Sequence, residues 1–520
     1  MAYLSGKQAF LEILKSEGVS VMFGNPGTTE LPLMDGLARE PGIRYVLALQ
    51  EAVAIAMADA YAQAHGGLAA VNVHVSPGLG NAMGMLYDAY KAHSPLLLTA
   101  GQHDQSFTVK TALAQPTGPV FLSLPVDVLN AERDNLDLLA PTRVAPRLVG
   151  DRAAIDAAAK RLVAATSPLI VAGDAVAHSD ALAELVELAE LIGAPVMLEG
   201  VSSTCSFPFT HPLYAGSMPR LGPGIKALLM RHDLLFSVGG DLFTLSLPSD
   251  VDPMPPGLDV VHLDVDPWEL GKNYPAAIAI QGDPKASLPE LCEAVRRHAG
   301  KGGHRDAGAR RETLSAKHAR ERDDLARRAA DDAKKSPMGP LALVHAVSRV
   351  VPDDVVVVDE AISSSAGIRN FFRCADAKSF FSLRGGGIGW GLPAALGVKL
   401  ALPQRPVVAL VGDGSAMYTA QALWTAAHES LAVVYVIFNN ASYRILKERT
   451  KALKGFSAED DRYVAMDLID PLIDYVGLAK SLGVAGEHVE KVADVGPAVG
   501  RALASGGPAL IDVRIDPSFN

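Results

Sequence analysis

The stretch that most constrains the fold runs from Val407 to Asn440, where a polar turn and a helical segment separate two apolar runs. The β-branched run Val407 to Val411 predicts a buried parallel strand that ends in the turn Gly412-Asp413-Gly414-Ser415. We expect Ser415 to cap a helix over residues 415 to about 430, before a second strand from Val433 to Phe438. Because a right-handed βαβ unit ends both strands at one edge of the sheet, the stretch predicts a parallel α/β fold.

Polar groups follow both of these strands. Asp413 comes directly after the first strand and Asn440 closes the second, so the two side chains can meet at one sheet edge. A carboxylate, an amide oxygen and a nearby backbone carbonyl form a set of hard oxygen ligands that suits Mg²⁺, with phosphate oxygens or water completing the octahedron. The adjoining helix N-terminus favours a phosphate, and Gly412 and Gly414 let the backbone approach it closely.

The length of 520 residues predicts about three domains, each with its own core. Alternating strands and helices predict three doubly wound, Rossmann-like parallel-sheet α/β domains over residues 1–145, 150–300 and 337–520. Residues 301–336 are rich in charged residues and predict an exposed helical linker. The further strands that we expect are residues 21–23, 45–49, 69–75, 95–100, 120–124, 167–173, 195–199, 234–240, 260–264, 277–281 and 355–358.

Charge and cysteine content exclude several classes of protein. The formal net charge of −11 disfavours nucleic acid or an anionic membrane as a partner. We see no apolar run of membrane-spanning length and no signal-peptide pattern at the N-terminus. The three cysteines, Cys205, Cys292 and Cys374, are scattered and predict buried thiols in a reducing compartment. We therefore expect a cytoplasmic protein.

Three stretches of the first domain carry candidate chemistry, although each also has an ordinary structural interpretation. The loop Gly24 to Pro32 can be a turn with a threonine cap. Glu51 follows Gln50 where a strand passes into an apolar helix, and an acidic residue there stabilises a helix without further function. His74 lies at the end of a predicted strand, before a loop that contains Gly78.

Two stretches of the last domain suit a bound cofactor. Residues 385–391 contain five glycines, which lose more backbone entropy on folding than other residues and therefore suit a backbone pressed against a ligand. Ser364 and Ser365 follow a predicted strand and can either cap a helix or bind diphosphate oxygens.

The order of these motifs resembles that of a known enzyme family. Gly-Asp-Gly at 412–414, the 24 residues from Ser415 to Phe438 (438 − 414) and the pair Asn439-Asn440 resemble the thiamine diphosphate motif. The resemblance runs along nearly the whole chain. It is to the superfamily of thiamine diphosphate-dependent 2-keto acid decarboxylases and acetolactate synthases, and above all to the benzoylformate decarboxylases.

The resemblance implies catalytic roles in the first domain. Glu51 matches the glutamate that bonds N1′ of the aminopyrimidine and stabilises its imino tautomer, which leaves the thiazolium as its ylid. His74 matches an acid/base histidine that serves the protonation steps. Thr28 stands where the benzoylformate decarboxylases have a serine, so that it could hold the substrate carboxylate.

The resemblance also implies the ligands of the cofactor and the metal. The carbonyl of Gly386 would accept the 4′-amino hydrogen, and Ile388 would be the apolar wedge that bends the cofactor into a V shape. Asp413, Asn440 and the backbone carbonyl of Ser442 would bind Mg²⁺. The full set of expected cofactor-binding residues is Pro26, Asn81, Ser364, Ser365, Gly386, Ile388, Gly412, Gly414, Ser415 and Tyr443.

The sequence departs from the family pattern around the substrate. Ser246 takes the place of a second active-site histidine, and the helix with Ile445, Leu446 and Arg449, which lines the substrate pocket in relatives, lacks an expected aromatic residue. These changes favour a substrate other than an aryl keto acid, or an anionic one. Between residues 102 and 118 the relatives carry several dozen more residues. A segment is thus either naturally lacking or has been removed from this sequence.

The resemblance implies a thiamine diphosphate- and Mg²⁺-dependent enzyme that decarboxylates a 2-keto acid through an enamine. It acts as a homodimer or homotetramer with active sites at the subunit interface. Close alternatives are an acetolactate synthase-like carboligase and an acyl-CoA lyase of the oxalyl-CoA type. A catalytically silent nucleotide-binding protein is a remote alternative. FAD or ADP on the central domain is possible but not favoured, because no GxGxxG follows its first strand.

Overall fold

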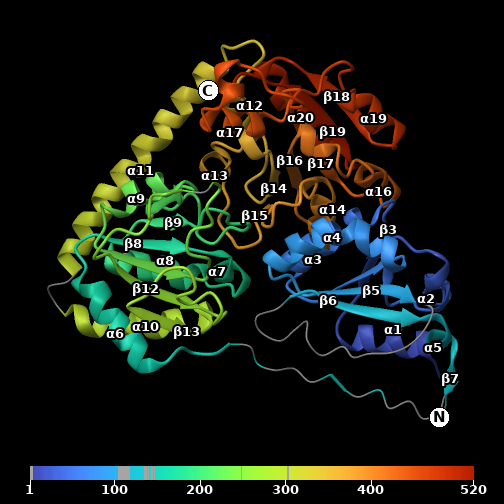
Figure 1. Cartoon of the computed structure of the whole chain (residues 1–520), viewed down its shortest axis with the longest axis horizontal. Helices are drawn as coiled ribbons and strands as arrows, with labels where there is room; N and C mark the ends of the chain where they lie inside the picture. Colours follow the sequence, from blue (N-terminus) through green and yellow to red (C-terminus); the bar gives the residue numbers. More distant parts are fainter. Residues whose placement is uncertain are drawn as a thin grey trace. The chain divides into compact units, whose positions relative to one another are not determined.

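The computed structural model describes residues 4–102, 118–133, 138, 140–141, 145, 147–247, 249–300 and 304–519. The chain divides into two compact units, each described below by itself (Figure 1). The first unit joins Met1–Val144, Arg328–Ile368 and Phe381–Asn520, and the second joins Ala145–Arg327 and Arg369–Phe380. The two ends of the chain therefore fold together. The shortened segment at 103–117 lies outside the described residues.

A five-stranded parallel sheet with the order β3-β2-β4-β5-β6 forms the N-terminal part of the first unit. Its strands are β2 (Val21–Gly24), β3 (Arg44–Leu47), β4 (Ala69–Val73), β5 (Leu96–Gln102) and β6 (Val120–Pro125). Its helices are α1 (Gly6–Ser16), η1 (Thr28–Glu30), α2 (Leu31–Leu37), α3 (Glu51–His65), α4 (Val75–Lys91) and α5 (Val126–Asn130). The short strands β1 (Leu4–Ser5) and β7 (Glu132–Arg133) pair antiparallel.

A six-stranded sheet with the order β15-β14-β16-β17-β19-β18 forms the C-terminal part of the same unit. Its strands are β14 (Val356–Glu360), β15 (Phe380–Ser382), β16 (Val407–Gly412), β17 (Val433–Asn439), β18 (Ala485–Val489) and β19 (Ala509–Arg514). Its helices are α12 (Pro340–Ser348), η2 (Ile362–Ser364), α14 (Gly391–Ala401), α15 (Asp413–Ala416), α16 (Ala422–His428), α17 (Arg444–Ala452), α18 (Phe456–Glu459), α19 (Tyr475–Ser481) and α20 (Val492–Ala504), whereas most of α13 (Ile368–Phe371) belongs to the second unit.

The second unit contains a six-stranded parallel sheet with the order β10-β9-β8-β11-β12-β13. Its strands are β8 (Pro168–Ala172), β9 (Val196–Leu198), β10 (Tyr214–Ser217), β11 (Leu234–Val238), β12 (Asp259–Asp264) and β13 (Ile278–Gln281). Its helices are α6 (Arg152–Ala164), α7 (Asp174–His178), α8 (Leu182–Ile192), α9 (Gly222–Leu229), α10 (Pro284–Ala299) and most of α11 (His304–Asp332). The prediction of three parallel-sheet α/β domains is confirmed.

Helix α3 links the two sheets of the first unit. It is alanine-rich and buried on nearly every side, which is the pattern of a helix enclosed in a core. It packs against α14 so closely that a Cβ atom on Gly397 would lie 2.0 Å from the backbone oxygen of Met57. Glycine is therefore required where the two helix backbones approach one another.

The predicted helix over residues 415–430 is wrong, because two short helices, α15 and α16, divide the segment. Gly412 has extended backbone angles and acts as the N-cap, so Ser415 lies inside α15 instead of capping a helix. Between the helices, the Thr419 hydroxyl donates a hydrogen bond to the carbonyl of Gly389. This tertiary contact favours the break in the helix over the local helical preference.

The predicted strand over residues 69–75 ends at Val73, and the expected loop around Gly78 is helical. Helix α4 begins at Val75, whose φ of 37° lies in a region that β-branched residues rarely adopt. His74 is the N-cap residue of this helix. The strained junction therefore sets the point at which the chain leaves the sheet edge.

Within the described part of the chain, we find no helix with both the length and the apolar character that crossing a membrane requires. The three cysteines are buried, unpaired thiols, as the sequence predicts.

We predict that Gly397→Ala will lower the free energy of unfolding by about 3 kcal/mol, because the added methyl group overlaps the Met57 carbonyl. Gly500→Ala is the matched control, since Gly500 lies in helix α20 with open space around its Cβ position. We expect the control to raise the free energy of unfolding by about 0.5–1 kcal/mol. Chemical denaturation measures both, and equal effects would contradict the close packing of α3 and α14.

Candidate active site

The carboxyl edge of the C-terminal sheet brings Asp413 and Asn440 together, as predicted. Strands β16 and β17 pair in parallel with Gly412 opposite Phe438, so both loops leave from the same edge. The Asn440 side-chain oxygen accepts hydrogen bonds from the backbone N–H of Ser442 (3.0 Å) and from its hydroxyl (2.8 Å). Ser442 therefore fixes the orientation of the amide oxygen that the sequence assigned to a metal.

The Asp413 carboxyl is 3% exposed, and burial raises its pKa to about 6. Its Oδ1 accepts a hydrogen bond from the N–H of Gly414 at 2.9 Å. Its Oδ2 is buried and, among the described residues, has no hydrogen-bond partner. A buried carboxylate oxygen without a donor needs either a cation or a proton. This oxygen therefore fits a metal ligand.

No group of three or more His, Cys, Asp or Glu side chains in the described ranges is arranged to hold a metal ion. A metal at Asp413 would thus depend on amide, backbone and ligand oxygens, as Mg²⁺ does when it binds a diphosphate. Ser442 and Asp467 form an isolated antiparallel bridge, whose two hydrogen bonds are accepted by the carbonyl oxygens of Ala441 and Met466. The bridge does not use the Ser442 carbonyl, which therefore suits the predicted role as a metal ligand.

Two tyrosines shape the same edge. The Tyr443 ring lies so close to Gly414 that a Cβ atom there would be 2.6 Å from it. The buried Tyr475 donates a hydrogen bond from its hydroxyl to the backbone oxygen of Asp413 at 2.8 Å. Tyr475 comes from α19, 62 residues further along the chain, and the local sequence pattern did not point to it.

Ser364 and Ser365 differ in their hydrogen bonding. The Ser365 hydroxyl donates to the carbonyl of Ile362 at 2.7 Å. The Ser364 hydroxyl is buried without a hydrogen-bond partner among the described residues. Ser364 is therefore the better candidate for a ligand of a bound diphosphate.

Glu51 occupies the first turn of α3 and is 6% exposed. Its two carboxylate oxygens accept hydrogen bonds from the side-chain amides of Asn25 (3.2 Å) and Asn81 (3.1 Å). The cap itself is made by Gln50, whose side chain accepts from the N–H groups of Ala52 and Val53. Gln50 therefore makes the cap, and Glu51 is an acidic residue of the first turn whose carboxylate is oriented by two side-chain amides.

His74 is held by Glu30, a residue that the sequence analysis did not select. The Nδ1 atom of His74 lies 2.8 Å from Oε2 of Glu30. Glu30, which is 1% exposed, also accepts hydrogen bonds from the N–H of Gly27 (2.8 Å), the hydroxyl of Thr29 (2.7 Å) and the N–H of Gly101 (2.7 Å). Burial acts to raise the pKa of Glu30, but these hydrogen bonds outweigh it and hold that pKa below its usual value.

Thr28 is exposed in η1, whereas its neighbour Thr29 is buried and lies 3.3 Å from His74 Nδ1. Thr29 therefore contacts this histidine, and the contact of Thr28 with a substrate carboxylate stays a prediction. Ile445, Leu446 and Arg449 share α17, a helix without buried residues. Ser246 belongs to the second unit, where its hydroxyl donates to the carbonyl of Arg220 at 3.1 Å.

The glycine-rich loop, residues 385–391, contains two glycines with positive φ. Gly386 has φ +93° with open space at its Cβ position, so its backbone angle alone requires glycine. Gly389 has φ +102°, and a Cβ atom there would also lie 2.5 Å from the Tyr418 side chain. Ile388 lies between these two glycines in the sequence and is half-buried.

The carboxyl edge of the sheet in the second unit is filled by a carboxylate. Glu199 accepts hydrogen bonds from the N–H of Asp174, at the start of α7, and of Asp241, after β11 (3.2 and 3.0 Å). A Cβ atom on Gly173 would lie 2.3 Å from the Gly239 carbonyl oxygen, so the two loops touch. A nucleotide diphosphate would need these same N–H groups.

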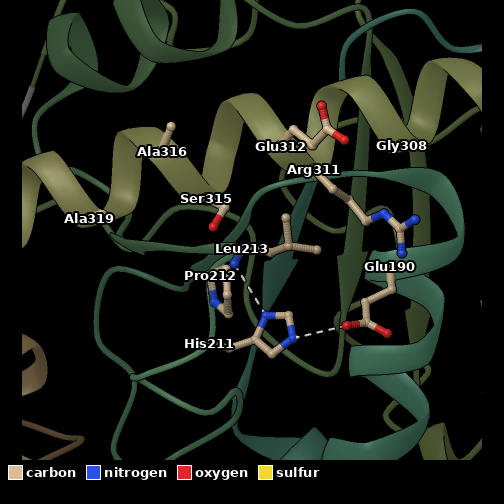
Figure 2. A pocket seen from close by; sticks show the side chains of 10 residues that line it. All are labelled: Glu190, His211, Pro212, Leu213, Gly308, Arg311, Glu312, Ser315, Ala316 and Ala319. Atoms are coloured by element: carbon tan, nitrogen blue, oxygen red, sulfur yellow. Dashed lines mark hydrogen bonds and ion pairs between the residues drawn. The ribbon is translucent and has the colours of Figure 1, made fainter.

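A surface groove of the second unit lies between α8, the loop before β10 and α11 (Figure 2). His211 approaches Glu190 at 3.4 Å and accepts a hydrogen bond from the N–H of Leu213 at 3.2 Å. The groove contains none of the residues that the sequence analysis selected. It is therefore not the candidate active site.

Comparison with known proteins agrees with this geometry. Residues 4–140, 155–291 and 363–513 match, in order, the N-terminal TPP binding, central and C-terminal TPP binding domains of the thiamine pyrophosphate enzymes. The chain belongs to the thiamine pyrophosphate enzyme family. The cofactor of the family is thiamine diphosphate, and its members include decarboxylases and synthases.

Individual relatives cover nearly the whole chain. A benzoylformate decarboxylase of Pseudomonas aeruginosa is 30% identical over 544 residues, covering 97% of this chain and 98% of its own. An acetolactate synthase of Mycobacterium bovis is 28% identical and covers 98% of this chain and 88% of its own. The structure of a thiamine diphosphate-dependent 4-hydroxybenzoylformate decarboxylase of Rhodococcus jostii RHA1 is 30% identical, with a TM-score of 0.86, and covers 99% of this chain and 100% of its own.

We predict that Glu30→Gln will lower the free energy of unfolding by about 3 kcal/mol at pH 7, because one amide oxygen cannot accept the four bonds that Glu30 accepts. Glu12→Gln, on the exposed surface of α1, is the control and should change it by less than about 0.5 kcal/mol.

The difference in the free energy of unfolding between Glu30→Gln and the unaltered protein should become smaller as the pH falls. The folded-state pKa of Glu30 is lowered, so its contribution is complete above the ordinary value of 4.5 and is lost as the pH falls through the folded-state pKa. Denaturation curves from pH 7 to pH 3 measure this, and a difference that grows below pH 4.5 would contradict an ionised Glu30.

Proposed function

We propose that the protein decarboxylates a 2-keto acid with thiamine diphosphate and Mg²⁺ as cofactors. The observation that carries this proposal is the Glu51 carboxylate, buried at a helix start and held by Asn25 and Asn81 without a capping role. A stability role alone does not require two amides to orient one carboxylate. A cofactor that must be protonated at one defined ring nitrogen does require a carboxylate with a fixed orientation.

The C-terminal edge supplies what the diphosphate end of the cofactor needs. The Asp413 Oδ2, the oriented Asn440 amide oxygen and the Ser442 carbonyl would bind Mg²⁺, and the Ser364 hydroxyl would donate to a diphosphate oxygen. When bound, thiamine diphosphate supplies the nucleophilic carbon and the electron sink for loss of CO₂.

The residues of the N-terminal domain control protons. Glu51 would hold a proton toward N1′ of the pyrimidine. His74 Nδ1 faces an ionised Glu30, so we assign the Nδ1 proton to that hydrogen bond. His74 Nε2 is thus the atom that would give a proton to the carbon that has lost CO₂, which aldehyde formation requires, whereas addition to a second carbonyl would need the proton on the new alkoxide oxygen.

Contacts in the second unit disfavour the acetolactate synthase-like carboligase, which is the alternative that bound FAD would indicate. Glu199 occupies the N–H groups that a bound dinucleotide would use, so we propose that the central domain holds neither FAD nor ADP. Flavin in the purified protein would favour an acetolactate synthase-like carboligase, and activity that requires coenzyme A would favour an acyl-CoA lyase.

We also propose a cytoplasmic homodimer or homotetramer in which two copies share each active site. This follows the family resemblance, in which the glutamate and the metal ligands of one site come from different subunits. Helix α4 supports the association, because Met83, Tyr87 and Tyr90 form an exposed apolar face at helical spacing. The buried free thiols agree with a reducing compartment.

We predict cofactor-dependent CO₂ release from at least one member of a panel of 2-keto acids that runs from pyruvate to benzoylformate. The product distinguishes an aldehyde-forming decarboxylase from a carboligase. In the same assay Glu51→Ala should lose at least about 10³-fold in kcat while it still binds thiamine diphosphate, because it removes proton control and leaves the diphosphate site intact.

Asp413→Ala should instead lose cofactor binding, measured by calorimetry with Mg²⁺ present. Turnover retained in Glu51→Ala would refute the proposed mechanism. Silence across the panel by a protein that binds the cofactor would refute 2-keto acid decarboxylation and leave the acyl-CoA alternative.

A further inference from the structure

Three buried carboxyl groups surround the glycine-rich loop, residues 385–391. They belong to Asp59 on α3, Asp88 on α4 and Glu360 at the end of β14, and each side chain is 1% exposed. The N-terminal domain supplies two of them and the C-terminal domain the third, and none was among the predicted site residues. Each of them accepts at least one hydrogen bond from the loop, and Asp59 also accepts from Gln63 and Ser94.

Glu360 holds the C-terminal end of the loop. Its Oε1 accepts hydrogen bonds from the N–H groups of Gly389 (2.7 Å) and Trp390 (3.3 Å), and its Oε2 accepts from that of Gly391 (2.6 Å). These donors include the first N–H groups of α14, which have no partner within the helix. Glu360 thus stabilises the start of α14 and fixes the peptide unit between Ile388 and Gly389.

Asp88 holds the other end. Its Oδ1 accepts a hydrogen bond from the N–H of Gly387 at 2.9 Å. That N–H belongs to the same planar peptide unit as the carbonyl of Gly386, and the two groups of a trans peptide point in opposite directions. The bond to Asp88 therefore turns the Gly386 carbonyl away from α4.

The residues on either side of this peptide are both glycines. Glycine adopts positive and negative φ with similar ease, so the 386–387 peptide can reverse its direction with little steric cost. The loop sequence alone does not choose one direction for the carbonyl. The contact with Asp88 makes that choice.

Asp59 supports the same loop through Trp390, whose indole N–H donates to Asp59 Oδ2 at 2.7 Å. Burying these three carboxyl groups close together has a free-energy cost. Burial raises the pKa of Asp88 to about 8, with Asp59 and Glu360 contributing, and burial raises that of Glu360 to about 7. Apolar residues would fill this core without that cost, so the carboxyl groups indicate a role beyond packing.

We propose that Asp88 is a positioning residue that fixes the direction of the Gly386 carbonyl toward the pyrimidine of the cofactor, while Glu360 fixes Ile388 beside it. This inference rests on the proposed function, in which Gly386 and Ile388 contact thiamine diphosphate. The recognition of the pyrimidine ring would then depend on Asp88 and Glu360, two side chains that act through the loop and not by contact with the cofactor.

The test compares Asp88→Ala with Asp88→Asn, using apo-protein and two probes, thiamine diphosphate and inorganic diphosphate, both with Mg²⁺. Asp88→Ala should bind thiamine diphosphate at least tenfold more weakly by calorimetry and lose the near-ultraviolet circular dichroism of the bound pyrimidine. Its affinity for inorganic diphosphate should stay within twofold, because that probe reaches only the Asp413 end.

Asp88→Asn should restore both readouts to within threefold, since the amide oxygen can accept from the Gly387 N–H. Asp264→Ala, a buried carboxyl of the second unit, is the control and should leave both affinities unchanged. Asp88→Ser replaces Asp88→Ala if the alanine variant does not fold, because its hydroxyl is too short to reach Gly387.

Equal thiamine diphosphate binding and dichroism in Asp88→Ala would overturn the positioning role. An equal loss of affinity for both probes would show that Asp88 has a general structural role, and it would also overturn the positioning role. Failure of the unaltered protein to bind thiamine diphosphate would instead refute the proposed function from which the inference starts.

Discussion

The close approach of helices α3 and α14 is the constraint on which the rest of the site depends. Gly397 lets the backbone of α14 reach the carbonyl of Met57 on α3, so the two helices cannot shift independently. Helix α3 begins at Glu51, and α14 begins at the end of the glycine-rich loop. The packing of two largely apolar helices thereby fixes the positions of two polar helix starts, one at Glu51 and one at the glycine-rich loop.

Around this packed pair, the polar groups of the site orient one another instead of relying on solvent. Asn25 and Asn81 hold Glu51, Glu30 holds His74, and Ser442 holds the amide of Asn440. Each arrangement buries charge or dipoles at a free-energy cost and gains a defined direction for a reactive atom. Two of the buried atoms without a partner among the described residues, Asp413 Oδ2 and the Ser364 hydroxyl, belong to residues that we propose to bind the cofactor and its metal.

The sequence correctly predicted the strands and the pairing that depend on local residue patterns. The runs at Val407 and Val433 gave the correct strands, and parallel pairing brought Asp413 to Asn440 as expected. The helix over 415–430 failed because Thr419 bonds to a loop that is distant in sequence, and the loop after His74 failed because α4 begins at a strained Val75. Glu30, Asp88 and Glu360 were missed for the same reason, since their roles depend on partners that only the folded chain brings near.

Complementation between Glu51→Ala and Asp413→Ala tests most directly whether these two halves make one active site shared by two copies. Each variant alone should be inactive. Co-expressed chains should recover about a quarter of the activity of the unaltered protein, because half of the dimers are mixed and one of their two sites then contains both intact halves. Recovery near that level would support the account, and mixed dimers without activity would contradict it.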